Sequence, residues 1–541
     1  MTTVDLTNLS EIIRIAYERG ETDGILQFAL LQSSTSSSNS ITAPRSDSSS
    51  SNSDTDEGSD LRKPKPNDDN NISNLMAYTA KELIDASLMA AQQAAAQQAA
   101  TAHGRKGYQS FQAAAASSII NGWVGSCCSL DVNPILGAQK VEQLLQEYDG
   151  LSSSSSGDDD TTTASMMPTL VPDIVTISLA YKAYLRASQY CASSGGDDSS
   201  SSPMKEHYFL NLAESMLERA ERMSKKQAGS KRRKALAAAR RRKSPSSTSD
   251  LENEIRELLG SNDFEILQET DDYLVINKPS GVSCYHKRST TAGKVKKIKK
   301  SKKKKVNEDD GEDDNDKNRD ISLEDALLHC NIPLSTLNPD GLGIVHRLDR
   351  GTSGCMVLAK TNSMHACLVS EFFLRRTTKS YMAVVVSPTT TQPNRVHDKF
   401  DNGNLDGNSN TITIDLPVDG RPAKSKVRHI QQYTDDKLGT IGSLVQVEIM
   451  TGRKHQVRKH CANEEGLGCP VLMDPLYGRR DNLTPSEDAG SSASETLRKL
   501  LMRPNDTTKD RLFLHSYQLS IPEYGIQAKA ACPWNDISTE T

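Results

Sequence analysis

The stretch HRLDRGTSG, from His346 to Gly354, decides how the rest of the sequence is interpreted. Apolar residues 344–345 precede it and the apolar run 356–359 follows it. Apolar runs on both sides of a short stretch that contains glycine predict a tight loop between two short strands. Gly351 and Gly354 allow positive φ angles and a close approach of a substrate backbone.

One carboxylate stands at the centre of this loop. Asp349 lies between Arg347 and Arg350, with one leucine intervening on the Arg347 side. Nearby positive charge favours the ionised carboxylate, which is the state that a nucleophile or a general base needs. The alternative is a charged surface loop without chemistry, which is the usual fate of such a cluster. The motifs on either side of the loop decide between the two interpretations.

Several further motifs occur in a fixed order around this loop, and together they resemble the RluA-type pseudouridine synthases, which modify RNA. The family motif is HRLDR, a variable residue and TSG, and every fixed position matches. The other matching stretches are YLVINKPSG at 273–281 with His286, KSYMA at 379–383, TGRKHQVR at 451–458, GCPVLMDPLYG at 468–478 and LFLHS at 512–516. They cover most of 262–523. Met473 and Val386-Ser387 depart from the family pattern, which usually has glycine at the first position and valine-glycine at the second.

The mixture of predicted strands and helices in this half of the chain indicates an α+β domain. The predicted strands are 264–267, 273–277, 381–386, 411–414, 424–430 and 443–449. The predicted helices are 323–330, with Ser322 as its cap, 363–375, and one that begins near Gly452. The resemblance implies the pseudouridine synthase fold, in which a long mixed sheet forms the core and carries a cleft across its middle.

The resemblance also implies the chemistry. The reaction isomerises uridine to pseudouridine, so it needs no cofactor and no metal, and we expect three catalytic residues: Asp349, Tyr381 and Arg458. Asp349 attacks the base or the sugar or removes a sugar proton, and the sequence leaves these open. Arg458 is the expected partner of its carboxylate, because a guanidinium holds a carboxylate bidentately. Tyr381 matches the tyrosine that stacks on the uracil and assists removal of the C5 proton.

Other basic residues are expected to contact the RNA. In the family that the sequence resembles, the arginine of the HRLD motif fills the gap left by the extruded base, and Arg347 is the matching residue. The alternative is that Arg347 forms an ion pair with Asp349. Arg453 and Lys454 are further candidate partners of Asp349 and better candidates for phosphate contacts. The remaining expected substrate contacts are Arg350 and Lys278, and Lys278 is also expected to shape the loop under the cleft with Pro279. We interpret His346 and His455 as structural hydrogen-bonding residues.

The composition limits the remaining possibilities. The 541 residues carry a net charge of −5, but acidic serine-rich tracts offset basic clusters, so the average does not exclude an RNA partner. The ten cysteines have no CxxC or His/Cys ligand spacing, which predicts reduced thiols and no zinc site. No signal peptide and no long apolar run is evident, so we expect neither export nor a membrane span. We expect an intracellular monomer of the nucleus or cytoplasm, with an organelle left open.

Composition shifts divide the chain into segments. We expect a short helical segment at 1–32, a disordered linker at 33–75, an α-helical region at 76–224, a basic linker at 225–250 and the catalytic domain at 251–535. Disordered insertions are expected at 287–320 and 389–409. The basic linker indicates nuclear targeting and RNA contact equally, and the two roles are compatible.

The helical region resembles degenerate pentatricopeptide repeats more weakly. Expected helices at 108–124, 137–148, 177–187 and 208–223, with a Pro-Asp turn at Pro172-Asp173, carry this resemblance. A generic helical region is the alternative. Two further alternatives concern the whole chain: a non-catalytic RNA-binding protein that retains the fold, and a helical-repeat RNA-binding protein with a subsidiary second half.

Overall fold

The computed structural model describes residues 78–99, 105–153, 172–193, 202–227, 248–286, 321–387, 411–478, 489–502 and 511–534, together with Phe400 and some residues between 9 and 17. The chain divides into two compact units, Met1–Met216 and Leu217–Thr541. The predicted linker at 33–75, the insertion at 287–320, and most of the segments 1–32, 225–250 and 389–409 lie outside the described residues. The predicted domain boundaries stay predictions.

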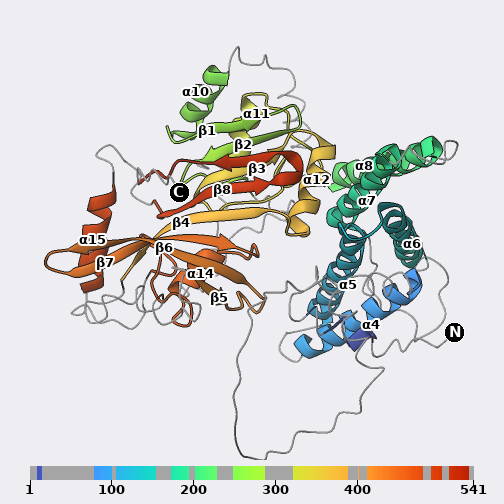
Figure 1. The fold of residues 1–541 in the computed structure, drawn as a ribbon, viewed down its shortest axis with the longest axis horizontal. Helices are drawn as coiled ribbons and strands as arrows, with labels where there is room; N and C mark the ends of the chain where they lie inside the picture. Colours follow the sequence, from blue (N-terminus) through green and yellow to red (C-terminus); the bar gives the residue numbers. More distant parts are fainter. Residues whose placement is uncertain are drawn as a thin grey trace, which may run out of the picture. The chain divides into compact units, whose positions relative to one another are not determined.

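The first unit consists of helices in its described part (Figure 1). These are α4 (Ala80–Ala99), α5 (Arg105–Cys127), α6 (Pro134–Ser153) and α7 (Ile174–Ser193), while α8 (Ser202–Gln227) crosses into the second unit. Helix α4 packs against α5, and α7 packs against both α5 and α6. Their core contains the fully buried rings of Trp123, Tyr148 and Tyr184. The four helices expected in this region are confirmed.

The Pro-Asp turn before α7 has a local structural explanation. The Asp173 carboxylate accepts a hydrogen bond from the Thr176 amide at 2.9 Å, as an N-cap residue does. It also accepts bonds from Ser117 Oγ at 2.9 Å and Asn121 Nδ2 at 3.2 Å, both on α5. The turn therefore begins α7 and fastens it to α5.

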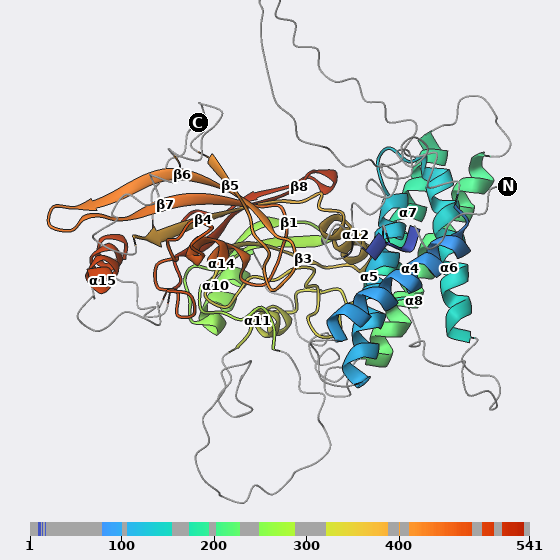
Figure 2. The same cartoon turned by 90° about the horizontal axis from the view of Figure 1, so that it is seen from below.

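The second unit is built on a mixed sheet, which confirms the predicted α+β class (Figures 1 and 2). Its order is β1-β2-β3-β8-β4-β7-β6-β5, and β9 pairs with β8 beside this path. The strands are β1 (Glu265–Glu269), β2 (Tyr273–Lys278), β3 (Ser353–Ala359), β4 (Thr378–Val386), β5 (Thr411–Asp415), β6 (Lys424–Asp435), β7 (Gly439–Ile449), β8 (Leu514–Ile521) and β9 (Ile526–Lys529). Strands β3 and β8 pair in parallel, and the other named pairs are antiparallel.

The parallel pair depends on one glycine. Gly354 pairs with Ser516 at the start of β3 and has a φ of 112°. A Cβ atom at this position would lie 2.2 Å from the Ser516 carbonyl oxygen, so no side chain fits without a shift of the backbone. Gly351 does not have the positive φ that its type allows, and a Cβ atom there would lie 3.1 Å from Leu512 Cβ. Both glycines thus admit neighbouring protein atoms, and the expected approach of a substrate backbone stays a prediction.

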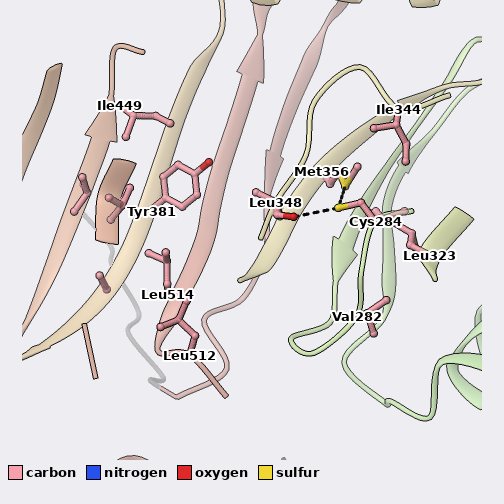
Figure 3. Close-up of a cluster of buried hydrophobic side chains, with 14 of the residues drawn as sticks. Val282, Cys284, Leu323, Ile344, Leu348, Met356, Tyr381, Ile449, Leu512 and Leu514 are labelled. Atoms are coloured by element: carbon pink, nitrogen blue, oxygen red, sulfur yellow. Dashed lines mark hydrogen bonds between the residues drawn. The ribbon is translucent and has the colours of Figure 1, made fainter. Parts of the chain in front are cut away.

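Helices cover both faces of this sheet. Helices α10 (Thr248–Leu259), α11 (Leu323–His329) and α14 (Gln456–Ala462) contribute to the same buried cluster as Tyr381 and Met356. Helices α12 (Asn362–Phe373) and α15 (Ala489–Leu501) pack on clusters formed by alternate residues of the strands, which point to the opposite face. Figure 3 shows the first cluster, in which the Cys284 thiol donates to the Leu348 carbonyl at 3.3 Å.

Most predicted elements of this unit are confirmed, including the helix that Ser322 caps through a capping box. The predicted strand at 344–345 is reduced to an isolated bridge between Ile344 and Leu358. Helices α10 and α15 and strand β9 were not predicted. All ten cysteines are buried as free thiols. In the described residues, no helix has the length and apolar character needed to cross a membrane.

Candidate active site

The turn after β2 holds the loop that carries Asp349 through hydrogen bonds. The Gly281 amide donates to the Arg350 carbonyl at 2.8 Å, and Ser280 Oγ donates to the Gly351 carbonyl at 2.7 Å. Within the loop, the Thr352 amide donates to the Asp349 carbonyl at 3.0 Å. These bonds fix the backbone at Asp349 and directly after it, and the Asp349 side chain keeps 25% of its surface exposed.

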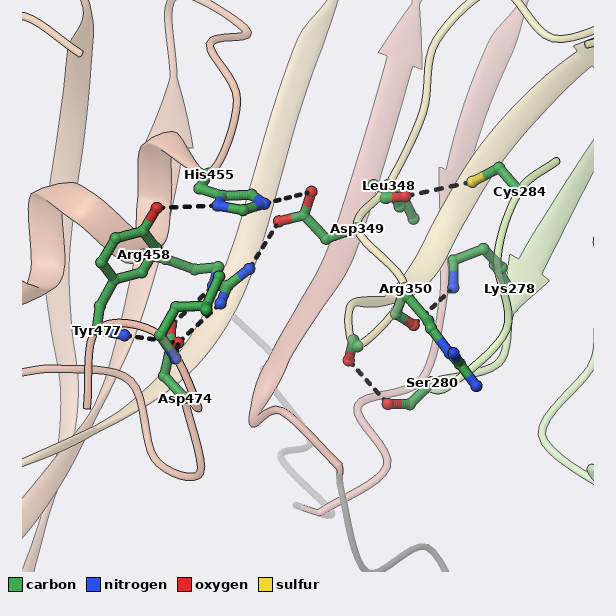
Figure 4. A network of polar contacts seen from close by, with 12 residues as sticks. Lys278, Ser280, Cys284, Leu348, Asp349, Arg350, His455, Arg458, Asp474 and Tyr477 are labelled. Atoms are coloured by element: carbon green, nitrogen blue, oxygen red, sulfur yellow. Dashed lines mark hydrogen bonds and ion pairs between the residues drawn. The ribbon is translucent and has the colours of Figure 1, made fainter. Parts of the chain in front are cut away.

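Lys278 supports the same loop (Figure 4). Its ammonium is fully buried and donates to the carbonyls of Pro279 at 2.8 Å, Val282 at 2.7 Å and Arg350 at 3.4 Å. Burial lowers the pKa of Lys278 to about 8. Since its three protons point at three carbonyls, the geometry favours the loop-shaping role over a direct contact with substrate.

Arg458 joins Asp349 to a second carboxylate, that of Asp474 (Figure 4). Its Nε and Nη2 atoms donate to the two oxygens of Asp474, both at 2.7 Å, and its Nη1 donates to Asp349 Oδ2 at 3.4 Å. The Asp474 side chain is completely buried and also accepts bonds from the amides of Leu476 and Tyr477. Burial opposes ionisation of Asp474, but the hydrogen bonds and charge of Arg458 outweigh it and lower the pKa of this carboxyl.

His455 approaches Asp349 from the other side. Its Nε2 lies 3.6 Å from Asp349 Oδ1, and its Nδ1 lies 2.9 Å from the Tyr477 hydroxyl. The residue has a left-handed backbone with a φ of 58° at the start of α14. Burial lowers the pKa of His455, although the charge of Asp349 opposes this. The lowered pKa favours the neutral ring, whose Nε2 faces the carboxylate of Asp349.

Tyr381 lies in β4 within the cluster of Figure 3, close enough to Asp349 for its pKa to respond to that charge. Burial first, and the negative charge of Asp349 second, raise the pKa of Tyr381, while a hydrogen bond with Ser516 acts in the opposite direction. The phenol is consequently neutral at pH 7. The structure thus brings together the three residues that were predicted as catalytic.

The other predicted basic residues lie around this centre. Arg347 is exposed, and its guanidinium carbon lies 5.6 Å from the centre of the Tyr285 ring; the described residues show no ion pair between it and Asp349. Arg350 is exposed and donates to the Gly281 carbonyl at 2.8 Å. Arg453 donates to the Pro422 carbonyl at 3.1 Å, and Lys454 is exposed. The guanidinium that donates to the Asp349 carboxylate is that of Arg458.

His346 agrees with its interpretation as a structural residue. Its Nε2 accepts a hydrogen bond from the Val357 amide at 3.0 Å, and its ring stacks on Phe372 with centroids 4.6 Å apart. Burial first, and the charge of Lys379 second, lower the pKa of His346 to about 3. It is a neutral acceptor that fastens the loop to β3.

Four residues of the site were not selected from the sequence: Asp474, His455 as a neighbour of Asp349, Tyr477 and Tyr285. Asp474 and Tyr477 lie in a quoted motif, but nothing in the spacing relates them to Arg458. Met473, just before Asp474, has a φ of 62°, a conformation that glycine adopts without cost. This accounts physically for the glycine usual at this position in the family.

Part of this chain is similar to known proteins. Residues 272–463 match the family model described as RNA pseudouridylate synthase. The chain is 32% identical over 223 residues to the ribosomal large subunit pseudouridine synthase D of Zymomonas mobilis. The aligned region covers 40% of this chain and 56% of that relative. It is 30% identical over 234 residues to an uncharacterised RNA pseudouridine synthase of Aquifex aeolicus, with 41% and 59% covered. The chain thus spans somewhat more than half the length of these relatives.

A likeness to a solved structure is also found. The human RNA pseudouridylate synthase domain containing 4 is 20% identical, with a TM-score of 0.31, and the likeness covers 53% of this chain and 94% of that chain. The matched family region contains Asp349, Tyr381 and Arg458, whereas Asp474 lies beyond its end.

We predict that Asp474→Asn lowers the free energy of unfolding of the second unit by roughly 3 kcal/mol at pH 7, because a half-broken buried ion pair leaves Arg458 poorly compensated. Urea unfolding followed by Trp534 fluorescence in a Trp123→Phe background reports on this unit, since the chain has two tryptophans. The folded carboxyl has a lowered pKa, so its contribution is present above the ordinary aspartate pKa of about 3.9 and disappears as the pH falls through the folded value.

Asp419→Asn is the matched control, because Asp419 pairs with Lys459 at the surface with 61% of its side chain exposed. We expect it to cost less than about 1 kcal/mol. Equal losses in the two variants would contradict the special role of the buried pair.

Proposed function

We propose that this chain, whose C-terminal half carries an RluA-type RNA pseudouridine synthase domain, converts uridine to pseudouridine in RNA. The observation that carries the proposal is the placement of Asp349. Its carboxylate is partly exposed, lies between Arg458 and His455, and stands on a loop whose backbone is fixed by hydrogen bonds. A surface charge cluster without chemistry would not need a completely buried second carboxylate to hold its arginine.

The reaction sets demands that these residues meet. The bond between N1 and the sugar breaks, the uracil turns, C5 joins the same sugar carbon, and the C5 proton is lost while N1 gains one. Atoms and electrons balance within the nucleotide, so the proposal includes no cofactor. Whether Asp349 acts on the base or on the sugar, its carboxylate must be held in one orientation, and Arg458 Nη1 donates to its Oδ2 at 3.4 Å.

Tyr381 is proposed to stack on the uracil. Its pKa is raised by burial and by Asp349, so the hydroxyl retains its proton at pH 7. A neutral phenol offers an aromatic face for stacking and a hydrogen bond, but it is not an ionised base waiting for the C5 proton. This favours the stacking part of the expected role over the proton-accepting part.

Arg347 is proposed to occupy the space left when the target base leaves its stack. Extrusion costs a few kcal/mol, and a planar guanidinium can stack in the gap. The contact of Arg347 with the Tyr285 ring supports this, because the exposed guanidinium already has an aromatic neighbour and is not paired with Asp349 among the described residues. The exposed Arg350 and Lys454, with Arg453, are proposed to contact phosphates.

The test is site-resolved chemical mapping of pseudouridine in total cellular RNA after incubation with wild-type protein or with Asp349→Asn. We expect new sites with wild type and a loss of at least about a thousandfold in rate with the variant, because the essential carboxylate is gone. Asp419→Asn serves as the control for an aspartate outside the site and is expected to behave as wild type. RNA binding without pseudouridine in any sample would favour the non-catalytic RNA-binding alternative.

The helical unit is proposed to add RNA affinity or choice of target, and pentatricopeptide-like repeats are one form that this role would take. The bundle of α4 to α7 and its capped Pro-Asp turn support a folded module but are also typical of a generic helical unit. The nuclear or cytoplasmic location and the monomeric state also stay predictions.

Deleting residues 1–245, which removes the helical unit and the end of α8, tests the roles of the two halves. We expect pseudouridine formation to survive with weaker RNA binding or a broader set of sites, because Asp349, Tyr381 and Arg458 all remain. The measurement is the same mapping, with RNA binding measured in parallel. If the deletion abolished RNA binding and left an inert remainder, the helical unit would be the main RNA-binding part.

A further inference from the structure

Lys379 is a half-buried cation that the proposed reaction has not yet used. It lies in β4, two residues before Tyr381, so the two Cα atoms are about 7 Å apart along the strand. Its Nζ lies 5.5 Å from the centre of the Phe372 ring. Among the described residues, no hydrogen bond and no ion pair reaches this ammonium.

The ammonium lies where three motifs of the site meet. A side-chain carbon placed on Gly452 would lie 3.8 Å from Lys379 Nζ, and Gly452 precedes His455 by three residues. On the other side, the charge of Lys379 helps to lower the pKa of His346, which precedes Asp349 by three residues. Lys379 is thus placed beside the Asp349 loop and beside the loop that leads into Arg458.

The electrostatic situation of Lys379 is unfavourable in the free protein. Proteins rarely remove a charge from water without a partner of opposite sign. Here the charged neighbour is another cation, and burial first, with the charge of Arg375 second, lowers the pKa of Lys379 to about 8. The ring of Phe372 compensates only part of the lost hydration. An anion at this point would relieve the imbalance.

We propose that the Lys379 ammonium binds a phosphate oxygen of the RNA backbone at the target nucleotide. This inference rests on the proposed function for the identity of the anion. Phosphate contacts fix the register of a nucleic acid on a protein, and a lysine ammonium binds phosphate as a point charge. Lys379 is therefore a positioning residue, which holds the backbone while the base reaches Tyr381 and the carboxylate of Asp349.

The test measures binding of a short fluorescein-labelled oligouridylate by anisotropy, with the full chain carrying Asp349→Asn so that no chemistry occurs. Each phosphate contact contributes to the salt dependence of binding through the release of counterions. We expect Lys379→Gln to reduce the slope of log Kd against log salt by about 0.7–1, and Lys379→Arg to keep it. Lys437→Gln, at an exposed turn between β6 and β7, is the matched control and should leave the slope unchanged.

Two further measurements separate this role from a structural one. Lys379→Met keeps the apolar stem beside Phe372, so it should unfold at the temperature of wild type while showing the slope of Lys379→Gln. In the Asp349 wild-type background, Lys379→Gln should modify the same sites in total cellular RNA when protein is in excess at low salt.

An unchanged salt slope in Lys379→Gln would overturn the inference, and so would inactivity of that variant at saturating protein with a normal slope. The proposed function fails separately, if wild-type protein forms no pseudouridine. The slope measurement does not depend on that result, because it is made without chemistry.

Discussion

The ion pair between Arg458 and the buried Asp474 is the interaction on which the site depends. A completely buried carboxylate is costly unless its oxygens are occupied, and Asp474 has two bonds from one guanidinium and two from backbone amides. This arrangement determines where the guanidinium lies. The remaining nitrogen, Nη1, then faces the partly exposed carboxylate of Asp349 at 3.4 Å. The bonds to Asp474 keep the guanidinium from turning away.

The sheet places the other parts around this pair. Strand β4 carries Tyr381 and Lys379 through the middle of the sheet, between β7 and β8. Strand β3 can pair with β8 because Gly354 has no side chain. This pairing fixes the end of the Asp349 loop. The buried Lys278 at the end of β2, together with the turn that follows it, holds the loop at Arg350 and Gly351. The hydrogen bond from the Val357 amide to His346 Nε2 fastens the beginning of the loop, so the loop that carries Asp349 is fastened at both ends.

Much of this arrangement could be predicted because it follows from short-range patterns in the sequence. Strand alternation and the Ser322 cap are short-range signals, and the HRLDR and TGRKHQVR motifs pointed to Asp349 and Arg458. Asp474 was missed because its role arises from a contact made across a turn, sixteen residues from Arg458, that no periodicity reports. The burial of Lys278 could not be predicted from the sequence either, since lysine is almost never fully buried. Strand β9 was missed because four residues give too little alternation to recognise.

The most direct test of the role of this ion pair is a double-mutant cycle on the rate of pseudouridine formation with Asp474→Asn, Arg458→Gln and the double variant, at protein excess and at the sites mapped for wild type. If Asp474 acts by holding Arg458 toward Asp349, the double variant should be no slower than Arg458→Gln alone. A double variant slowed by the product of the two single effects would show that the two residues act independently, and would contradict the central role of their ion pair.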